Sequence, residues 1–360
     1  MKARIVIGSN YGDEGKGSVV ASYSKQSGSV LNVLTNGGSQ RGHSILTKDG
    51  SMTFQHFGSG TYYGAGNYYS RFFILNPMQF VKEYETLILK PSVMYRDANC
   101  RWSTPYDAMA NLIEEEQRGR HASCCMGIWN TVRRYREMPT MTLDEFVNSE
   151  TNVIYLQDVK RYYEKFVTIP SQWRPIWDGP MMMTHFINDC KFLCDAVKVA
   201  DLSALSFDEL IFENGQGLLL CDTGKDTFDT TPSNTGIKYS LELLKGLNVD
   251  EVTAHYVTRP YLTRHGDGHL FGESGRGFIS KDISEDRTNH FNFGQGEFRY
   301  GNLDVRSLKD RIEADFRQSV GLVNARAVLE ITHCDEMDRV AEFRKVFGDM
   351  KIRTYESPLV

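Results

Sequence analysis

The segment IVIGSNYGDEGKGSVVASYSK, residues 5–25, joins a short apolar run to a glycine-rich turn that carries two carboxylates and a lysine. The backbone N–H groups of such a turn, the N-terminus of a following helix and the ammonium group of Lys16 are suited to bind a polyphosphate. The turn departs from the standard phosphate-binding loop, because Asn10 replaces its first glycine and Gly17 follows the lysine directly. Asp13 lies inside the turn, where its carboxylate could hold Mg²⁺ or accept a proton.

Three more glycine-rich turns follow strand-like runs: TNGGSQRGHS at 35–44, ENGQG at 213–217 and TRHGDGH at 263–269. His43 in the first of them could stabilise charge that develops on a phosphoryl group in transit. A series of ordinary tight turns is the alternative interpretation. The combination of the glycine-rich turn within residues 5–25 and the TNGGSQRGHS turn favours a site for phosphoryl chemistry.

Strand-like apolar runs alternate with helical patterns along the chain, which predicts an α/β fold. The runs IVIG, VLNVLTNGG, FFILNP, LIFENGQGLLLCD and AVLEITHCDE are predicted strands, and SLKDRIEADF carries a helical apolar stripe. We expect one domain over residues 1–360, related to the P-loop folds, with a mainly parallel central sheet, helices on both faces and additional loops and helices. GTYYGAGNYYS and the polar stretch 138–180 are predicted insertions. Ligands should lie at the carboxyl ends of the strands.

Composition limits the possible functions. The chain has 41 Lys and Arg against 46 Asp and Glu, a formal net charge of -5, which does not favour nucleic acid as a partner. No apolar run is long enough to cross a bilayer, so no membrane association is expected. The seven scattered cysteines suit a reducing cytoplasm. Cys190 and Cys194 lack a second pair for zinc, and His255, His265 and His269 are more typical of a binding loop than of a metal site.

The ordered set of motifs resembles the adenylosuccinate synthetase family. Residues 12–17 are similar to its GDEGKG signature, and residues 36–44 resemble its NGG-x-x-AGHT segment. Further similarities follow in the family's order: 213–217 (E-G-A-Q-G), 231–234 (TSSN), 263–268 (TRVGAG) and 299–304 (R-x-GW-[LF]-D). The resemblance extends from residue 5 to about residue 335.

The resemblance implies a ligase reaction in two stages. A nucleoside triphosphate phosphorylates O6 of a 6-oxopurine nucleotide, and the amino group of L-aspartate then displaces the phosphate. By the same resemblance Asp13 removes the N1 proton and binds Mg²⁺, the main-chain carbonyl of Gly42 completes the metal site, His43 donates to the phosphoryl group and Gln216 holds the base.

The remaining implied residues fall into two groups. The triphosphate, ATP or GTP, is expected at Gly12, Glu14, Gly15, Lys16, Gly17, Ser18, His333, Asp335 and Ser357. The purine monophosphate and aspartate are expected at Asn36, Gln40, Ser123, Cys124, Thr231, Arg264, Gly266 and Arg299. The family also implies a homodimer in which an arginine reaches the neighbouring site. The basic run 133–136 is the candidate segment, and a solvated helix face is its alternative interpretation.

Departures from the family pattern bear on the substrate. Met126 stands where the family has an arginine that serves the aspartate step, and Gln40-Arg41 replace Asn-Ala. The arginine cluster that reads the ribose 2′-hydroxyl is reduced to Arg299, with Glu297 nearby. Loss of that cluster favours a deoxynucleotide, and compact phage members of the family use dGMP to make 2-amino-2′-deoxyadenylosuccinate, a precursor of 2-aminoadenine in DNA. We therefore expect dGMP as the acceptor.

Three alternatives remain open at this point. Retention of Asp13 is compatible with IMP, the acceptor of ordinary members. Met126 and Glu297 would also suit a catalytically inactive nucleotide-binding regulator. A plain P-loop NTPase or kinase is the third alternative, although Ser18 is one place late for it. His333 replaces a lysine of the family's guanine-reading T-K-L-D segment, which predicts a relaxed choice between ATP and GTP.

Overall fold

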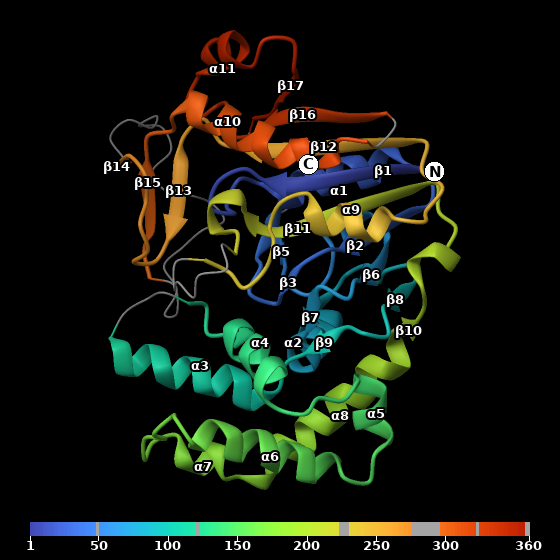
Figure 1. The fold of residues 1–360 in the computed structure, drawn as a ribbon, viewed down its shortest axis with the longest axis vertical. Helices are drawn as coiled ribbons and strands as arrows, with labels where there is room; N and C mark the ends of the chain where they lie inside the picture. The colour runs from blue at the N-terminus through green and yellow to red at the C-terminus, as the bar shows by residue number, and fades with distance from the viewer. Residues whose placement is uncertain (48–49, 120–122, 223–229, 276–295, 322–323, 357–360) are drawn as a thin grey trace.

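The computed structural model describes residues 1–47, 50–119, 123–222, 230–275, 296–321 and 324–356. Within them, a sheet of nine strands forms the centre of the molecule, in the order β10-β8-β6-β2-β11-β1-β12-β16-β17 (Figure 1). All of its pairings are parallel. The strands are β1 (Lys2–Gly8), β2 (Val30–Leu34), β6 (Gly66–Tyr69), β8 (Met94–Arg96), β10 (Lys198–Val199), β11 (Glu209–Gly217), β12 (Glu251–Thr258), β16 (Ala325–Ile331) and β17 (Lys351–Thr354).

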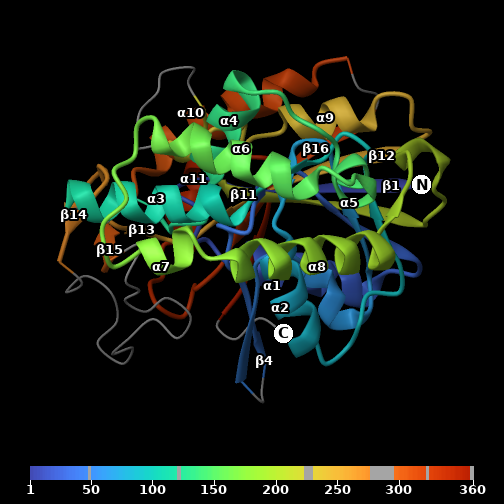
Figure 2. The same ribbon diagram turned by 90° about the horizontal axis from the view of Figure 1, so that it is seen from below.

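Alternating residues of β1 pack against helices on opposite faces of this sheet. Ile5 and Ile7 belong to a core cluster that includes residues of α9 (Lys238–Leu244), α10 (Val305–Phe316) and α11 (Val340–Phe347). Val6 faces the other way and packs with Val19 and Val20 of α1 (Lys16–Gln26). Figure 2 shows α1 on one side of the sheet and α9 and α10 on the other. The predicted α/β fold with a parallel sheet and helices on both faces is confirmed.

Three smaller sheets surround the carboxyl end of the large one. The strands β13 (Leu262–His265), β15 (Phe298–Gly301) and β14 (Glu273–Ser274) pair antiparallel. The strands β3 (Gly37–Gly38), β7 (Phe73–Leu75) and β9 (Arg101–Trp102) are parallel, and β4 (His43–Thr47) forms an antiparallel pair with β5 (Gly50–Phe54). Short 3₁₀ turns complete the described elements: η1 (Ser59–Tyr63), η2 (Leu202–Ala204), η3 (Leu218–Leu220) and η5 (Arg317–Ser319).

A layer of helices lies beside the β10 end of the sheet, seen in green in the lower part of Figure 1. It contains α3 (Pro105–Arg118), α4 (Ile128–Glu137), α5 (Leu143–Asn148), α6 (Asn152–Glu164), α7 (Arg174–Trp177) and α8 (Pro180–Ala196), with α2 (Pro77–Thr86) packed on α8. Thr104 and Asp107 start α3 with a reciprocal capping box, and Pro105 occupies its first position. No helix of the described residues is both long and apolar enough to span a membrane.

One of the two predicted insertions is wrong, because the tyrosine-rich stretch belongs to the central sheet, whereas the stretch 138–180 forms helices outside it. The tyrosine-rich stretch contains β6, an internal strand of the large sheet, and its Tyr68 and Tyr69 are buried. The polar stretch 138–180 folds into α5, α6 and α7, whose Phe146, Leu156 and Trp177 are fully buried in the largest core cluster. The polar residues of α5 to α7 cover the solvent side of helices whose apolar residues face the core, whereas β6 is buried along its whole length. The predicted strand 210–222 also ends earlier, at Gly217, and continues as the turn η3.

Candidate active site

The GDEGKG turn is held together by its own acidic and basic side chains. Glu14 points back into the turn, where its Oε1 accepts hydrogen bonds from the N–H groups of Asn10 at 3.0 Å and Gly12 at 2.8 Å. The Nζ of Lys16 donates to the main-chain oxygen of Gly12 at 2.6 Å and lies 3.4 Å from Oε2 of Glu14. Because Glu14 occupies these two N–H groups, phosphate contacts are left to the rest of the turn and to the N-terminus of α1.

Close backbone packing explains two of the glycines at this site. Gly12 has φ of +115°, and a Cβ there would lie 3.0 Å from Cα of Gln216. A Cβ on Gly217 would lie 2.3 Å from the main-chain oxygen of Asn10. The turns after β1 and β11 therefore touch backbone to backbone, which side chains at these positions would prevent.

Side chains from α10 and from the segment after β16 support the GDEGKG turn. Thr332 Oγ1 donates to the main-chain oxygen of Glu14 at 2.7 Å. Arg311 donates from Nε to Ser9 O at 2.9 Å and from Nη2 to Asn10 Oδ1 at 2.7 Å. The turn is thus fixed by elements that come from the far end of the chain.

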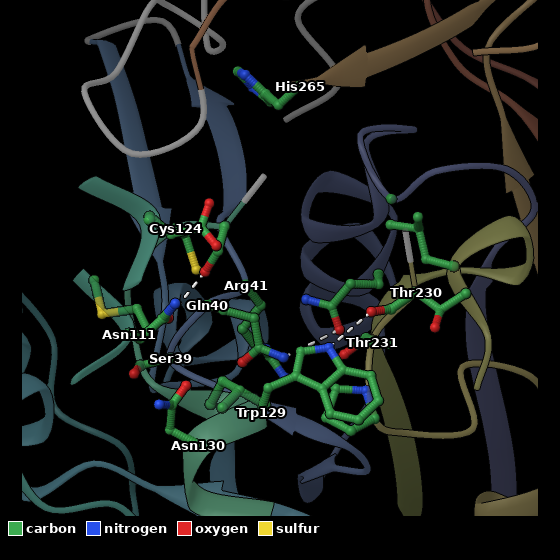
Figure 3. A pocket seen from close by; sticks show the side chains of 18 of the residues that line it. Ser39, Gln40, Arg41, Asn111, Cys124, Trp129, Asn130, Thr230, Thr231 and His265 are labelled. Carbon is green, nitrogen blue, oxygen red and sulfur yellow. Dashed lines mark hydrogen bonds between the residues drawn. The ribbon is translucent and has the colours of Figure 1, made fainter. Parts of the chain in front are cut away.

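A pocket of about 500 Å³ opens in front of this turn (Figure 3). Asn111 and Cys124 lie on one side of it and Thr230 and Thr231 on the other, while Trp129 extends toward Thr230. Ten of the residues predicted from the sequence line this one pocket: Gly12, Asp13, Gln40, Gly42, His43, Ser123, Cys124, Gln216, Thr231 and Arg264.

The helical layer contributes one wall of the pocket through α3 and α4. Asn111 Oδ1 accepts from Ser123 Oγ at 2.9 Å and from Gly127 N at 3.1 Å, which ties the loop before α4 to α3. Trp129 Nε1 donates to Thr230 O at 3.0 Å and joins α4 to the loop after β11. The helical layer and the sheet therefore meet across the pocket.

His43, at the start of β4, contacts the carboxylate of Glu213 in β11 of the large sheet. Its Nδ1 lies 2.5 Å from Oε1 of Glu213, and both side chains are buried. Burial lowers the pKa of His43 to about 3, and the nearby Arg41 charge acts in the same direction against the opposing effect of Glu213. Burial alone would raise the pKa of Glu213, but Arg41, His43 and Ser59 together lower it to about 2. At neutral pH Glu213 is therefore a carboxylate, and neutral His43 donates to it from Nδ1.

Asp13 is half-buried and lines the pocket. Burial raises the pKa of its carboxyl group, and the charge of Glu14 adds to that effect. Electrostatic interactions with His265, Arg259 and Lys16 act in the opposite direction and lower this pKa. A carboxylate whose pKa is raised in this way is a stronger base than an exposed aspartate, so it is suited to accept a proton.

Gln216 has an unusual backbone conformation for its residue type. Its φ is +57°, in the left-handed region, and its Oε1 accepts from Gln40 Nε2 at 3.4 Å. Backbone strain of this kind collects at functional sites. Cys125 and His333 also have positive φ and lie in two segments that the sequence singled out.

Three of the residues predicted to bind substrate do not line the pocket. Asn36 is buried and bridges the turn after β11, with its Nδ2 2.9 Å from Ser233 Oγ and its Oδ1 2.9 Å from Gly215 N. Arg299 donates to Glu273 Oε2 at 2.8 Å and to the main-chain oxygen of Gly268. Gly266 lies in the turn after β13.

The residues predicted to bind the triphosphate lie behind and beside the GDEGKG turn. Gly15 precedes α1 with φ of +88°, Gly17 and Ser18 belong to its first turn, and a Cβ on Gly17 would lie 2.7 Å from Ser44 O. His333 is buried after β16, and Asp335 is exposed there. The hydrogen bond from Thr332 to Glu14 O brings this segment against the turn. Ser357 lies outside the described residues.

Other expectations about histidines and arginines are corrected by the structure. His255 does not share a loop with His265 and His269, because it is buried in β12 with its Nδ1 2.6 Å from Glu330 Oε1. The basic run 133–136 is not a uniform solvated face, since Arg134 is fully buried and binds Asp107 at 2.9 Å.

Sequence reasoning assigned no role to several residues of the site. Glu213 was part of a motif, but it lies 170 residues from His43 in the sequence, and only the fold brings the two side chains together. Trp129 and Asn111 line the pocket from the helical layer, and neither was predicted. His265, predicted only as part of a binding loop, lines the pocket and acts electrostatically on Asp13. The position of Glu213 three residues before Gln216 was the one available signal for the first of these.

Fold and pocket define a nucleotide-handling α/β enzyme whose site lies at the carboxyl ends of parallel strands. The family model described as adenylosuccinate synthetase matches residues 5–344. The chain belongs to the adenylosuccinate synthetase family and is a carbon–nitrogen ligase.

Curated relatives agree with this assignment. The chain is 23% identical over 375 residues to adenylosuccinate synthetase of Buchnera aphidicola subsp. Acyrthosiphon pisum (strain Tuc7). This match covers 98% of this chain and 81% of that protein. It is 25% identical over 279 residues to the enzyme of Blochmanniella pennsylvanica (strain BPEN), over 73% of this chain and 63% of that protein.

Two solved structures share the fold. Fully ligated adenylosuccinate synthetase from Plasmodium falciparum superposes with a TM-score of 0.72 at 18% identity, over 93% of this chain and 77% of that chain. Succinoaminodeoxyadenylate synthetase of cyanophage S-2L, bound to dGMP and dATP, superposes with a TM-score of 0.64 at 11% identity. The latter match covers 99% of this chain and 93% of that chain.

Proposed function

We propose that this chain joins L-aspartate to C6 of dGMP, using ATP or GTP as the phosphoryl donor, and forms 2-amino-2′-deoxyadenylosuccinate. In the first stage Asp13 accepts the N1 proton, and O6 attacks the γ-phosphorus of the triphosphate. The bond between that phosphorus and the β,γ-bridging oxygen breaks, and the nucleoside diphosphate leaves with its electrons. In the second stage the neutral amino group of aspartate attacks C6, the phosphate leaves with the C6–O6 bond electrons, and the new C6–N bond is left as a secondary amine after the nitrogen releases one proton. The observation that carries the proposal is that Asp13, His43 and Gln216 line one pocket together with Thr231 and Arg264.

Each central residue has a role that follows from its contacts. Asp13, with its raised pKa, is the base. His43 is tied to Glu213 through Nδ1, so Nε2 is the ring nitrogen that remains for the phosphoryl group. Nε2 donates there once the negatively charged phosphates are bound and the ring takes up a second proton, and the Glu213 carboxylate compensates that positive charge. Gln40 orients the amide of Gln216, which then holds the purine edge near Asp13.

Mg²⁺ fits the donor set at the turn. Within the described residues no group of three or more His, Cys, Asp or Glu side chains could hold a metal ion. Asp13 and the main-chain carbonyl of Gly42 both line the pocket, and Mg²⁺ is commonly bound by one or two carboxylates with substrate phosphates and water. Bound there, Mg²⁺ would neutralise negative charge on the phosphates.

Two observations support dGMP as the acceptor. Arg299, the remaining arginine of the thinned cluster, is bound to Glu273 and Gly268 and does not line the pocket. The cyanophage S-2L enzyme, which has the same fold over almost all of this chain, was solved with dGMP. The Asp13 carboxylate can accept from both N1–H and the 2-amino group of guanine. IMP is the competing acceptor, and retention of Asp13 is the observation that favours it.

The donor site is proposed at the N-terminus of α1 and the segment after β16. Lys16 and the N–H groups of the first helical turn face the phosphates, and Asp335 accepts from the base. His333 in place of a lysine gives no contact that excludes adenine, so ATP and GTP both serve. Ser357 is proposed as a second contact to the base.

The proposed assembly is a homodimer with shared sites. Within the run 133–136, Arg134 is buried with Asp107 and Arg133 binds Glu114 at 3.2 Å. Arg136 is exposed and lies at the pocket wall, so it is the member that we propose reaches a substrate phosphate at the subunit boundary.

A substrate panel tests the proposal directly. The purified chain is incubated with Mg²⁺, ATP or GTP, L-aspartate and one of dGMP, GMP, dIMP or IMP, and the succinyl adduct is measured by mass. We expect kcat/KM for dGMP to exceed that for IMP by about tenfold or more. A tenfold preference for IMP would contradict the choice of acceptor. No adduct with any purine would identify an inactive nucleotide-binding protein, and the Asp13→Asn variant serves as the background control.

A further inference from the structure

Arg41 is a fully buried arginine beside the reacting groups. Its Nη2 lies 3.0 Å from Oε1 of Glu213 and 3.3 Å from the main-chain oxygen of Phe57, and neither side chain of the ion pair is exposed. Burying a guanidinium is costly unless a carboxylate and further acceptors surround it. The buried guanidinium of Arg41 therefore indicates a role that an apolar side chain at position 41 could not perform.

The carboxylate of Glu213 is surrounded by donors. Oε1 accepts from His43 Nδ1 at 2.5 Å, from Ser59 Oγ at 2.6 Å and from Arg41, and Oε2 accepts from Ser59 N at 2.9 Å and Asn32 Nδ2 at 3.2 Å. With all these donors in place the carboxylate has one orientation. His43 must then present Nδ1–H to Glu213 and Nε2 to the pocket.

We propose that Arg41 is a positioning residue for the phosphoryl transfer: by holding Glu213 in place, it fixes the orientation and tautomer of His43. This inference rests on the proposed role of His43. Arg41 lines the pocket, but its guanidinium contacts Glu213 and the main-chain oxygen of Phe57, so we assign its effect on the reaction to Glu213. Loss of Arg41 lets the carboxylate turn toward Ser59 and Asn32, so that the imidazole is no longer held by one strong acceptor.

A double-mutant cycle tests whether Arg41 acts through His43. Arg41→Met is compared with wild type, and again in the His43→Ala background. We expect Arg41→Met alone to lower kcat about tenfold or more with KM for both nucleotides nearly unchanged, and to have less than about a twofold effect once His43 is absent. Equal losses in both backgrounds would overturn the proposal. Arg41→Lys keeps a positive charge and is expected to recover part of kcat.

A second measurement does not depend on the reaction. The ¹⁵N resonances of the His43 ring are recorded in the unliganded protein at fixed pH. We expect the Nδ1–H tautomer alone in wild type and a mixture of tautomers in Arg41→Met, with Arg41→Lys in between. The control Arg134→Met removes an equally buried guanidinium from its pair with Asp107 and should leave the His43 signals unchanged.

The two measurements separate the inference from the proposed function. An unchanged His43 tautomer in Arg41→Met would overturn the inference even in an active ligase. A changed tautomer in a protein that forms no succinyl adduct would support the inference and contradict the proposed reaction. If Arg41→Met does not fold, Arg41→Lys is compared with wild type in its place. A lysine that leaves both the His43 tautomer and kcat unchanged would show that the two-pronged guanidinium of Arg41 is not needed to position His43.

Discussion

The Nε of Arg259 lies 2.7 Å from the main-chain oxygen of Asp13, across the boundary between β12 and the GDEGKG turn. Arg259 is 2% exposed, and its Nη1 also donates to Tyr261 OH at 3.1 Å. Its contact is with the backbone of Asp13, so it fixes the turn and leaves the carboxylate available. The same guanidinium lowers the pKa of that carboxylate, against the larger effect of burial.

Arg259→Met should therefore loosen the turn and raise the pKa of Asp13. We expect kcat to fall about tenfold or more, since a catalytic group displaced by about 1 Å can cost about a hundredfold. Steady-state kinetics with the preferred acceptor measures this. Arg339→Met is the matched control, because Arg339 donates to the main-chain oxygens of Pro260 at 2.8 Å and Leu303 at 3.0 Å, outside the pocket. Equal losses in the two variants would argue against a specific role for Arg259.

Asp13→Asn keeps the size of the side chain and removes the base. We expect kcat to fall by about 10² to 10⁴, the usual effect of losing a positioned general base. Circular dichroism and the melting temperature check that the fold is unchanged. A loss of less than tenfold would mean that another group accepts the N1 proton.

Arg136 provides a test of shared sites. The Arg136→Ala and Asp13→Asn variants, each expected to have little or no activity, are purified separately. They are then mixed under conditions in which dimers exchange subunits. If Arg136 reaches the partner's pocket, one site of each mixed dimer is intact, and activity should return to about a quarter of the wild-type value. Absence of recovery in a verified dimer would assign Arg136 to the pocket of its own chain.

Asp315 should make stability depend on pH. Burial raises the pKa of its carboxyl group to about 6, although hydrogen bonds from Tyr256 and Ile237 lower it. The folded protein therefore keeps a proton that the unfolded chain loses near pH 4. The contribution to the free energy of unfolding is complete below about pH 4 and is lost as the pH rises through about 6, a change of about 3 kcal/mol.

Urea unfolding at a series of pH values measures this contribution as a difference from Asp315→Asn. We expect the wild type to lose stability relative to that variant between about pH 4 and pH 7. Asp310→Asn changes an exposed carboxylate on the same helix and should show no such step. A constant difference across the range would rule out a raised pKa for Asp315.

Most of the central fold was predictable because its elements have strong local patterns. Ile5, Val6 and Ile7 before a glycine turn indicate a buried strand, and Leu308 and Ile312 mark the buried side of α10. The strand β6 was missed because Gly66 and Asn67 look like a turn. Its stability comes from pairing with β2 and β8 and from buried Tyr68, which a local pattern does not contain.

The pocket was predictable only as a set of motifs. Asp13, His43 and Gln216 lie in glycine-rich turns, and the strand ends bring them together. Arg41 and Glu213 are far apart in the sequence, and their ion pair exists because β2 lies beside β11. The wall formed by α3 and α4 was not predictable either, since Trp129 and Asn111 belong to no phosphate-binding pattern.

The place of β1 in the large sheet also determines when this site can form during folding. β1 precedes the other strands of this sheet in the sequence, yet Ile5 lies opposite Phe212 of β11 and Ala254 of β12. Pairing over such sequence distances slows folding, because the ends of a long loop have to meet before the contacts form. Asp13 is therefore held in place only after most of the chain has left the ribosome, and until then the apolar strand before it stays unpaired and exposed to aggregation.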